Sequence, residues 1–529
     1  MKKIASFTVK SLLLIALALM FVVALDNGSE SASAQGPDGA TVGRSEKHDV
    51  SAALRTIAPV RVQAQKFERE NPMAPVRLQK EGADEALQTA APSGAMPAPI
   101  ANFAGVNTAG SGCTCYPPDT NLDVSATQVF QTVNLAFEIW DKAGNVLYGP
   151  AHNNTIWSGF GGTCETQNNG DPVVKYDRMA NRWVFMQFGQ LSAPYNLCLA
   201  VSQTSDALGA WYRYSFVVSS NQLPDYPKLA VWPDGYYVSI NAFTNGATWA
   251  GPKPYVFDRA SMLNGAAATF QTFTSLGSTH APQLPSDLDG VTPPPAGAPN
   301  YFVEFGNPQK WYAFHVDWAN SANSTFTNYA STSVATFRII CANTRSCIAQ
   351  PGTTVKLDAI GDRLMYRLSY RNFGTYESLV ANHTVQVSRG VAGVRWYEFR
   401  NPSAPTVFQQ ATYSPDDNAR WMGSIAQDKQ GNMALGYSVS SKTNNVFPSI
   451  RYAGRLATDP LNQLSQAETT LIAGTGSQTG SADRWGDYSA MQVDPTDDCT
   501  FWYTTEYYIT TASVNWQTRI GSFKFPGCN

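Results

Sequence analysis

The sequence predicts an all-β fold, a seven-bladed β-propeller. A unit of roughly sixty residues recurs along the chain, and each copy consists of predicted strands and turns. The composition agrees, because 15% charged residues, 40 Gly and 32 Pro are typical of a β protein with many turns. A repeat of this length that is built only from strands indicates a propeller.

Each unit begins with an acid or a serine and continues with a short apolar strand. A turn rich in Asp, Asn, Gly or Pro follows, and then a second strand with period-two alternation. Clear examples are GDPVVKYDRMANRWVFMQF from Gly170 and GDYSAMQVDPTDDCTFWYTTEYY from Gly486. The units place the starts of the blades near Pro117, Gly170, Asp225, Pro285, Gly361, Met422 and Gly486. The fourth blade is the least regular, because prolines stand where a strand or its turn is expected.

A third strand follows each unit, as in NLCLAVSQ from Asn196 and TRIGSFKF from Thr518. Seven such strands can be found, so we predict seven blades. The last blade ends directly after its third strand, and an open edge in the ring would be an aggregation hazard. We therefore expect the segment PIANFAGVNT, just before Cys113, to supply the missing strand and to close the ring.

The N-terminal region predicts export. Lys2 and Lys3 precede an apolar run over 11–25, and Ala-Ser-Ala at 32–34 resembles a cleavage site, which together indicate a signal peptide over residues 1–34. Residues 35–97 are rich in Ala, Pro, Gln, Glu and Arg, and we interpret them as a propeptide or a flexible, disordered linker. The propeller then spans 98–529. We expect a secreted protein, extracellular or at the cell surface, with no membrane span in the mature chain.

Eight cysteines in an exported chain predict disulfides. Cys499 opens the second strand of the last blade and Cys528 follows its third strand, so antiparallel pairing places them opposite each other. Cys164 and Cys198 fall at one face of blade two, and Cys341 and Cys347 would close a small loop. Cys113 and Cys115 remain, bonded to each other or elsewhere.

Two stretches resemble known families. CTCYPPDTN from Cys113, with GDPVVKYDRMANRW from Gly170, resembles a family of secreted bacterial β-propeller proteins without established activity. The resemblance covers nearly all of the chain from Cys113 to Cys528 and implies fold and export, with no catalytic residues. Ser205 to Trp211 is similar to a degenerate Asp box of sialidase-like propellers, which implies a stabilising turn and no sialidase activity.

Two sets of polar residues are expected at one mouth of the central channel. The first set opens the inner strands and contains Asp119, Asp171, Asp225, Asp362 and Asp487, with Ser424 in blade six. The second set lies on the second strands and contains Asn134, Gln187, Asn241, Ser438 and Glu506, with Asn382 or His383 in blade five. One interpretation is structural, because an Asp at a strand start caps its own turn. The other is a ligand site, in which carboxylates would favour calcium if a metal binds.

Residues that differ from their equivalents in the other blades are candidates for catalysis or for binding an anionic group. Glu506 is the one carboxylate of the second set and His383 the one imidazole, and with Tyr366 they are the candidate catalytic residues. Arginines flank the openings of three consecutive blades and could bind an anionic group, or could instead brace aromatic rings. They are Arg363, Arg420 and Arg484.

The leading prediction is a monomeric propeller that binds a glycan or a surface protein at the mouth. Aromatic residues in or next to loops suit a polysaccharide, or else fill the space between blades, among them Trp157, Tyr195, Trp249 and Tyr507. The alternatives are a glycoside hydrolase or polysaccharide lyase, and an envelope scaffold. Scattered Lys and Arg and a net charge of -3 argue against nucleic acid. No cofactor is indicated other than possible calcium.

Overall fold

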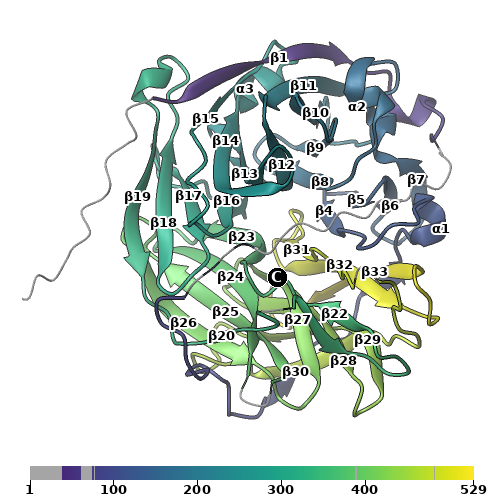
Figure 1. Ribbon diagram of the computed structural model, residues 1–529, viewed down its shortest axis with the longest axis vertical. Coiled ribbons are helices and arrows are strands. Elements are labelled where there is room, and N and C mark those ends of the chain that lie inside the picture. The colour runs from purple at the N-terminus through teal and green to yellow at the C-terminus, as the bar shows by residue number, and fades with distance from the viewer. Residues whose placement is uncertain are drawn as a thin grey trace, which may run out of the picture.

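The computed structural model describes residues 39–60, 74, 76, 78–342, 344–387, 390–481 and 483–529. Its strands form seven antiparallel blades around a common centre (Figure 1), so the predicted seven-bladed propeller is confirmed. Blades two and three share one continuous sheet, and so do blades four and five. In blades one to six the strands follow one another in chain order from the centre outwards, and in blade seven the outermost strand comes from the N-terminal region. The predicted signal peptide lies outside the described residues.

The strands of blades one to three begin close to the predicted openings. Blade one contains β4 (Asn121–Val124), β5 (Gln128–Val133), β6 (Ala136–Asp141) and β7 (Val146–His152). Blade two contains β8 (Val173–Asp177), β9 (Arg182–Phe188), β10 (Tyr195–Ser202) and β11 (Trp211–Ser219). Blade three contains β12 (Gln222–Trp232), β13 (Gly235–Thr244), β14 (Thr248–Phe257) and β15 (Thr269–Thr272).

The other four blades complete the ring. Blade four contains β16 (Gln283–Asp289), β17 (Asn300–Glu304), β18 (Gln309–His315) and β19 (Thr325–Thr332). Blade five contains β23 (Met365–Asn372), β24 (Glu377–Gln386), β25 (Ala392–Arg400) and β26 (Thr406–Tyr413). Blade six contains β27 (Ala419–Gln427), β28 (Met433–Ser441), β29 (Val446–Arg455) and β30 (Gln466–Ile472). Blade seven contains β31 (Ala490–Val493), β32 (Thr500–Tyr508) and β33 (Trp516–Lys524).

The remaining elements are short. A segment between blades four and five carries β20 (Arg338–Ile339), β21 (Ser346–Ala349) and β22 (Lys356–Asp358). The helices are α1 (Thr108–Ser111), α2 (Gly162–Thr166), α3 (Arg259–Leu263) and the 3₁₀ turns η1 (Leu54–Thr56), η2 (Asn153–Trp157) and η3 (Ser321–Asn323). None of the helices in the described part of the chain has the length and apolar character that a membrane crossing needs.

The ring is closed as predicted. The N-terminal strand β3 (Ala101–Ala104) pairs antiparallel with β33 and becomes the fourth strand of blade seven. The disulfide between Cys499 and Cys528 joins the two neighbouring strands of the same blade, with their α-carbons 5.7 Å apart. The other predicted pairs, Cys164–Cys198 and Cys341–Cys347, are also formed. Cys113 bonds to Cys115, which resolves the pairing that the sequence left open.

The hydrophobic core lies between neighbouring blades. The ring of Phe130 in blade one, for example, has its centroid 5.5 Å from that of Trp183 and 5.8 Å from that of Phe185, both in blade two. Such interblade packing also takes up aromatic residues that the sequence places near loops. Trp157 is fully buried, and Tyr195 and Tyr507 are 4% and 7% exposed, so these three have the packing role and do not form a ligand-binding surface.

The N-terminal segment before β3 differs from the flexible linker that its composition predicts. We call its described residues, 39–60, 74, 76 and 78–97, the N-terminal strap. Its first strand, β1 (Thr41–Val50), pairs with β15 and then with β11, and so joins blades two and three across their outer edges (Figure 1). Farther along, the strap bridges to Thr412 of blade five and, through β2 (Gly94–Ala95), to β30 of blade six.

Backbone hydrogen bonds explain why the strap was missed. An outer strand offers unpaired N–H and C=O groups to any extended segment, whatever its side chains are. Most side chains of β1 remain exposed or partly exposed, so the strand has no alternating apolar pattern. Removal of the segment as a propeptide stays a prediction.

The sequence similar to an Asp box forms the turn between β10 and β11. One carboxylate oxygen of Asp206 accepts hydrogen bonds from the backbone N–H of Leu208 at 2.9 Å and from the amide of Gln128 at 2.8 Å. The indole N–H of Trp211 donates to the carbonyl of Ala207 within the turn at 2.9 Å. The motif therefore stabilises a turn, as its resemblance implies.

Candidate functional site at the channel mouth

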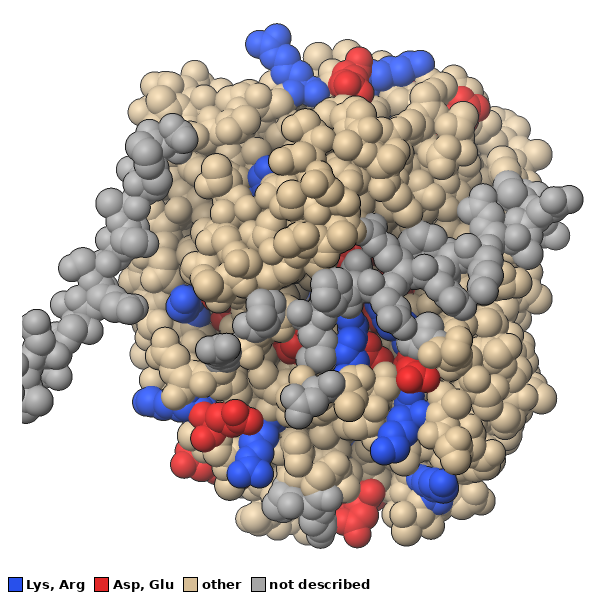
Figure 2. Space-filling model, viewed as in Figure 1, with Lys and Arg blue, Asp and Glu red and all other residues tan. Residues whose placement is uncertain are grey.

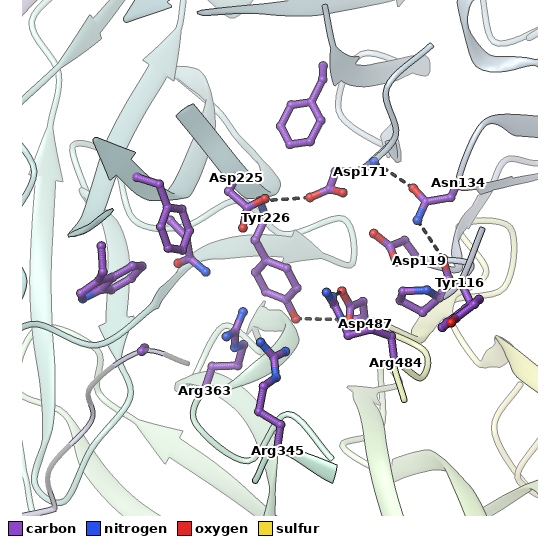
Figure 3. Close-up of a pocket in the computed structure, with 16 residues that line it drawn as sticks. Tyr116, Asp119, Asn134, Asp171, Asp225, Tyr226, Arg345, Arg363, Arg484 and Asp487 are labelled. Carbon is purple, nitrogen blue, oxygen red and sulfur yellow. Dashed lines mark hydrogen bonds and ion pairs between the residues drawn. The ribbon is translucent and has the colours of Figure 1, made fainter. Parts of the chain in front are cut away.

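Most of the predicted ligand-binding residues line a single cavity at the entrance of the central channel (Figure 3). The cavity encloses about 30 Å³, room for roughly two water molecules. Of the predicted residues it is lined by Asp171, Asp225, Asn241, Arg363, Arg484 and Asp487. Carboxylates of Asp119, Asp171 and Asp225 lie along one side, and the guanidinium groups of Arg345 and Arg363 lie on the other.

The turns that enter the inner strands place these side chains. Asp119, Asp171, Tyr226 and Asp487 have φ values of 50, 46, 52 and 61° and so share a left-handed backbone. This conformation is uncommon for a residue other than glycine, and Asp tolerates it better than most. The recurrence of Asp at the blade openings thus has a backbone cause, and Tyr226, not Asp225, takes the equivalent place in blade three.

The structural interpretation predicts that each Asp caps its own turn, but the hydrogen bond of the Asp171 carboxylate goes to the next blade. A carboxylate oxygen of Asp171 accepts a hydrogen bond at 3.0 Å from the backbone N–H of Tyr226, in the next blade. The N–H of Asp171 in turn donates to the side chain of Asn134 in blade one, also at 3.0 Å. Most inner strands of a propeller lie too far apart for direct backbone pairing, so polar side chains link one blade to the next.

Two neighbouring carboxyl groups at the mouth hold protons unusually tightly. Burial and the charge of Asp171 raise the pKa of Asp119 well above its usual range. Burial and the charge of Asp225 raise the pKa of Asp171 to about 6. Two carboxylates that share one site cannot both ionise easily, so the pair carries less than its full charge at mildly acid pH.

We expect this pair to make the stability fall as the pH rises. The folded protein binds a proton at Asp171 more tightly than the unfolded chain does, in which an Asp has a pKa of about 3.9. The resulting stabilisation is complete below about pH 3.9 and is lost as the pH passes through about 6, a change of roughly 2 to 3 kcal/mol. Asp171→Asn should flatten this part of the curve of unfolding free energy against pH, measured by urea unfolding between pH 4 and 7.

The control for this measurement is Asp417→Asn. Asp417 is an exposed acid in the turn between β26 and β27 and is not among the residues that line the cavity. The unfolding free energy of Asp417→Asn should change with pH as steeply as that of the wild-type protein. If the curves of unfolding free energy against pH were parallel for the wild-type protein and Asp171→Asn, the pH dependence could not be assigned to Asp171.

Arginines balance the acids of the mouth. Arg363 forms a bidentate pair with Asp362, with N···O distances of 2.8 and 3.0 Å. A carboxylate oxygen of Asp362 also accepts a hydrogen bond from the backbone N–H of Ala74 in the strap, at 2.9 Å. Arg484 pairs with Asp487. Asp362 is thus held beside the cavity by Arg363 and Ala74 and is not among its lining residues.

A calcium site at the mouth lacks support. Across the described residues, no three His, Cys, Asp or Glu side chains are grouped so that they could hold a metal ion. One oxygen of Asp171 is held by a backbone N–H group, and one oxygen of Asp487 is held by Arg484.

The three candidate catalytic residues do not share a site. His383 is fully buried between blades, where its ring packs on Phe305 and Phe337 and its Nε2 lies 2.8 Å from the hydroxyl of Tyr397. Glu506 is also fully buried and accepts a hydrogen bond from the N–H of Gly486 at 2.7 Å. The prediction that these two groups face one cavity is therefore wrong.

Tyr366 and Arg420 also lie away from the cavity lining. The hydroxyl of Tyr366 donates to the carbonyl of Leu229 at 3.1 Å, inside the channel. Arg420 is fully buried and pairs with Asp416 at 2.7 Å and Glu468 at 2.8 Å within blade six. Arg420 is therefore a brace, one of the two roles that the sequence left open for it, and does not bind a ligand at the mouth.

The mouth also contains residues that the sequence analysis did not assign to it. They are Tyr116, Phe188, Tyr226, Phe243 and Arg345, besides Ala74 of the strap, whereas Trp249 is one of the aromatic residues that the sequence analysis named. Aligning the repeats on the proline in Asp171-Pro172 and Tyr226-Pro227 would have identified Tyr226. Arg345 comes from the segment between blades four and five, outside the repeat, and no pattern marks it.

Comparisons with known proteins do not identify a family. No family model matches the sequence, and no curated protein matches it. A protein of unknown function from Dyadobacter fermentans is 9% identical, with 81% of this chain and 99% of that chain covered and a TM-score of 0.37. An endo-arabinase from Bacteroides thetaiotaomicron is 13% identical, with 55% and 94% covered and a TM-score of 0.26.

An α-L-arabinanase from Cellvibrio cellulosa is 8% identical, with 64% of this chain and 91% of that chain covered and a TM-score of 0.27. Likeness at these values carries no information on ligand or activity. The assignment of the fold rests on the strand order, and the resemblance to a secreted propeller family stays a prediction.

Proposed function

We propose that the protein is a secreted propeller that binds a glycan at the channel mouth. The observation that carries this proposal is a set of buried polar atoms that line the cavity with unused hydrogen-bonding capacity. Asp119 Oδ1, Asp487 Oδ1 and the indole Nε1 of Trp249 have no hydrogen-bond partner within the part of the chain that the structure describes.

Such atoms are costly in a folded protein unless a ligand or water satisfies them. The Asp487 acceptor, the Asp119 carboxyl group and the Trp249 donor match the hydroxyl groups of a sugar, each of which both donates and accepts. Phe188, Phe243 and Tyr226 line the same cavity and offer apolar ring surface beside these polar atoms. Aromatic rings next to a few placed polar groups are what a sugar ring binds.

The cavity must widen for a sugar to enter. Its present volume of about 30 Å³ is smaller than a sugar ring. Ala74 lines the cavity from the strap, and its backbone N–H is bonded to Asp362. Binding therefore involves displacement of Ala74 from the mouth.

The charged surface gives no reason to prefer a nucleic acid. On the face shown in Figure 2, Lys and Arg are few and lie among Asp and Glu. Phosphate backbones are bound by concentrated basic surfaces. The separation of Glu506 from His383 removes the residue set on which the hydrolase or lyase alternative depended, so we propose binding without a reaction.

We expect Asp487→Asn to weaken glycan binding about 10- to 100-fold. Arg484 binds the other oxygen of Asp487 and will hold the amide oxygen of Asn, so that the NH₂ group replaces Oδ1 and an acceptor becomes a donor. The loss of a hydrogen bond to a charged group has roughly this effect. The full chain would be titrated with soluble xylan, β-glucan, pectin and arabinan, with binding followed by calorimetry.

Asp417→Asn serves as the matched control, since it makes the same change at an exposed acid. Equal affinities of the two variants would place the binding site elsewhere. Absence of binding to all four polysaccharides would contradict the proposal and would favour the envelope-scaffold alternative.

A further inference from the structure

The channel beneath the mouth is closed first by an aromatic layer. The ammonium of Lys228 lies 3.3 Å from the ring centroid of Tyr226 and 3.7 Å from that of Tyr488, at cation–π distance. The ring centroid of Tyr366 lies 5.9 Å from the same ammonium. The hydroxyl of Tyr226 donates to the backbone carbonyl of Asp487 at 2.8 Å, which fixes the layer to the rim.

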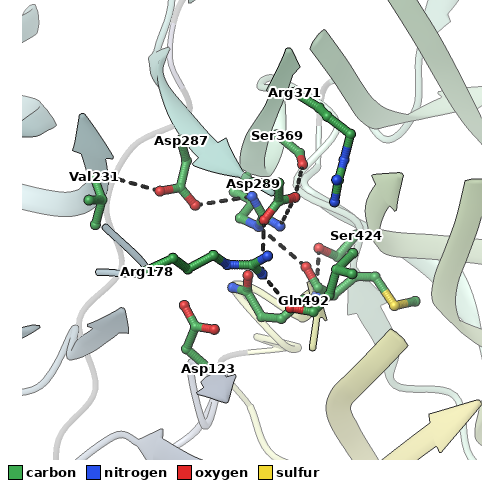
Figure 4. Close-up of polar contacts among 12 residues, drawn as sticks. Asp123, Arg178, Val231, Asp287, Asp289, Ser369, Arg371, Ser424 and Gln492 are labelled. Carbon is green, nitrogen blue, oxygen red and sulfur yellow. Dashed lines mark hydrogen bonds and ion pairs between the residues drawn. The ribbon is translucent and has the colours of Figure 1, made fainter. Parts of the chain in front are cut away.

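A second layer of buried ion pairs fills the channel (Figure 4). Lys175 of blade two contacts Asp123 of blade one at 2.9 Å and Asp287 of blade four at 2.7 Å. Arg367 of blade five contacts Asp287 at 3.1 Å and also Asp289. The side chains of these five residues are at most 4% exposed. They come from four blades, so the network spans the channel from side to side.

The lining residues of the cavity are distributed around the ring. They come from blades one, two, three, five and seven, from the segment that carries Arg345 and from Ala74 of the strap. A polymer that binds through its interior needs a groove that is open at two sides, because the chain must enter and leave. Once Ala74 is displaced, a pit with a closed floor admits only an end.

We infer that the mouth receives the terminal sugar of a glycan chain and not an internal segment. This inference rests on the proposed function. The unused acceptor of Asp487, the unused Oδ1 of the Asp119 carboxyl group and the unused donor of Trp249 would then bind hydroxyl groups of the terminal ring. Affinity would depend on the terminal residue and hardly on the length of the chain behind it.

The test compares each polysaccharide before and after limited acid hydrolysis, which multiplies the chain ends at constant sugar mass. Soluble xylan, β-glucan, pectin and arabinan would each be titrated into the full chain, intact and cut to about one tenth of the original length. If ends are bound, the number of binding sites per milligram of polysaccharide should rise about tenfold. Asp487→Asn should weaken this binding about 10- to 100-fold in both forms, and Asp417→Asn should retain it.

The outcomes separate the two proposals. Binding with an unchanged number of sites per milligram after hydrolysis would overturn recognition of chain ends and leave glycan binding intact. Affinity that increases with each added sugar, measured with oligosaccharides of two to six units, would overturn it in the same way. No binding to any intact or hydrolysed sample would overturn both proposals.

Discussion

Arg367→Met is expected to lower the free energy of unfolding by about 3 to 5 kcal/mol. Arg367 is 1% exposed and lies in the ion-pair layer that fills the channel, where it contacts Asp287 and Asp289. Methionine fills a similar space but leaves two buried carboxylates with less compensating charge. The cost of one uncompensated buried charge greatly exceeds the net gain from an intact pair. Guanidinium chloride unfolding followed by Trp fluorescence would measure the change.

Two further variants make this prediction specific. Arg367→Met combined with Asp289→Asn removes one of the stranded charges and should recover at least about 1 kcal/mol. Arg55→Met removes an arginine whose pair with Asp206 is solvent-exposed, with side chains 54% and 41% accessible, and should cost no more than about 1 kcal/mol. Equal losses for Arg367→Met and Arg55→Met would show that the channel network is not structurally important.

Removal of the disulfide between Cys499 and Cys528 is expected to cost about 3 to 4 kcal/mol. The bond closes a loop with a sequence separation of 29 residues in the blade that completes the ring. In the chain-entropy model the stabilisation grows with the logarithm of loop length. The double variant Cys499→Ser and Cys528→Ser should therefore unfold at a distinctly lower denaturant concentration than the wild-type protein.

The matched control is the disulfide between Cys341 and Cys347, whose sequence separation is 6. The same model gives about 2 kcal/mol for its removal by double substitution with Ser. A loss for the Cys499–Cys528 bond that is no larger than this would contradict a special role for the closing blade.

The fold could be predicted because its information is local. A blade consists of strands that are consecutive in sequence, so each hairpin is specified by its own alternation and turn residues. The closing strand followed from simple counting, since three strands of blade seven at the end of the chain required a fourth. Register across one hairpin was also enough to pair Cys499 with Cys528.

The site could be predicted only in part. The openings of the blades correctly marked Asp171, Asp225 and Asp487 as residues of the mouth. Similar reasoning failed for His383 and Arg420, which occupy comparable places in the repeat but are buried between strands. In a propeller both faces of a blade pack against neighbouring blades, so alternation along a strand does not distinguish a side chain that faces the channel from one that faces a core.

By itself, the sequence determined the all-β class, the seven blades, the closure of the ring and three disulfides, because each depends on residues within one hairpin or on the order of hairpins. Only the tertiary structure decided which acids share a cavity, that Asp171 bonds the next blade, and that the N-terminal strap lies along the outer strands. These features depend on contacts between blades and on backbone hydrogen bonds. Neither leaves a periodic side-chain pattern in the chain.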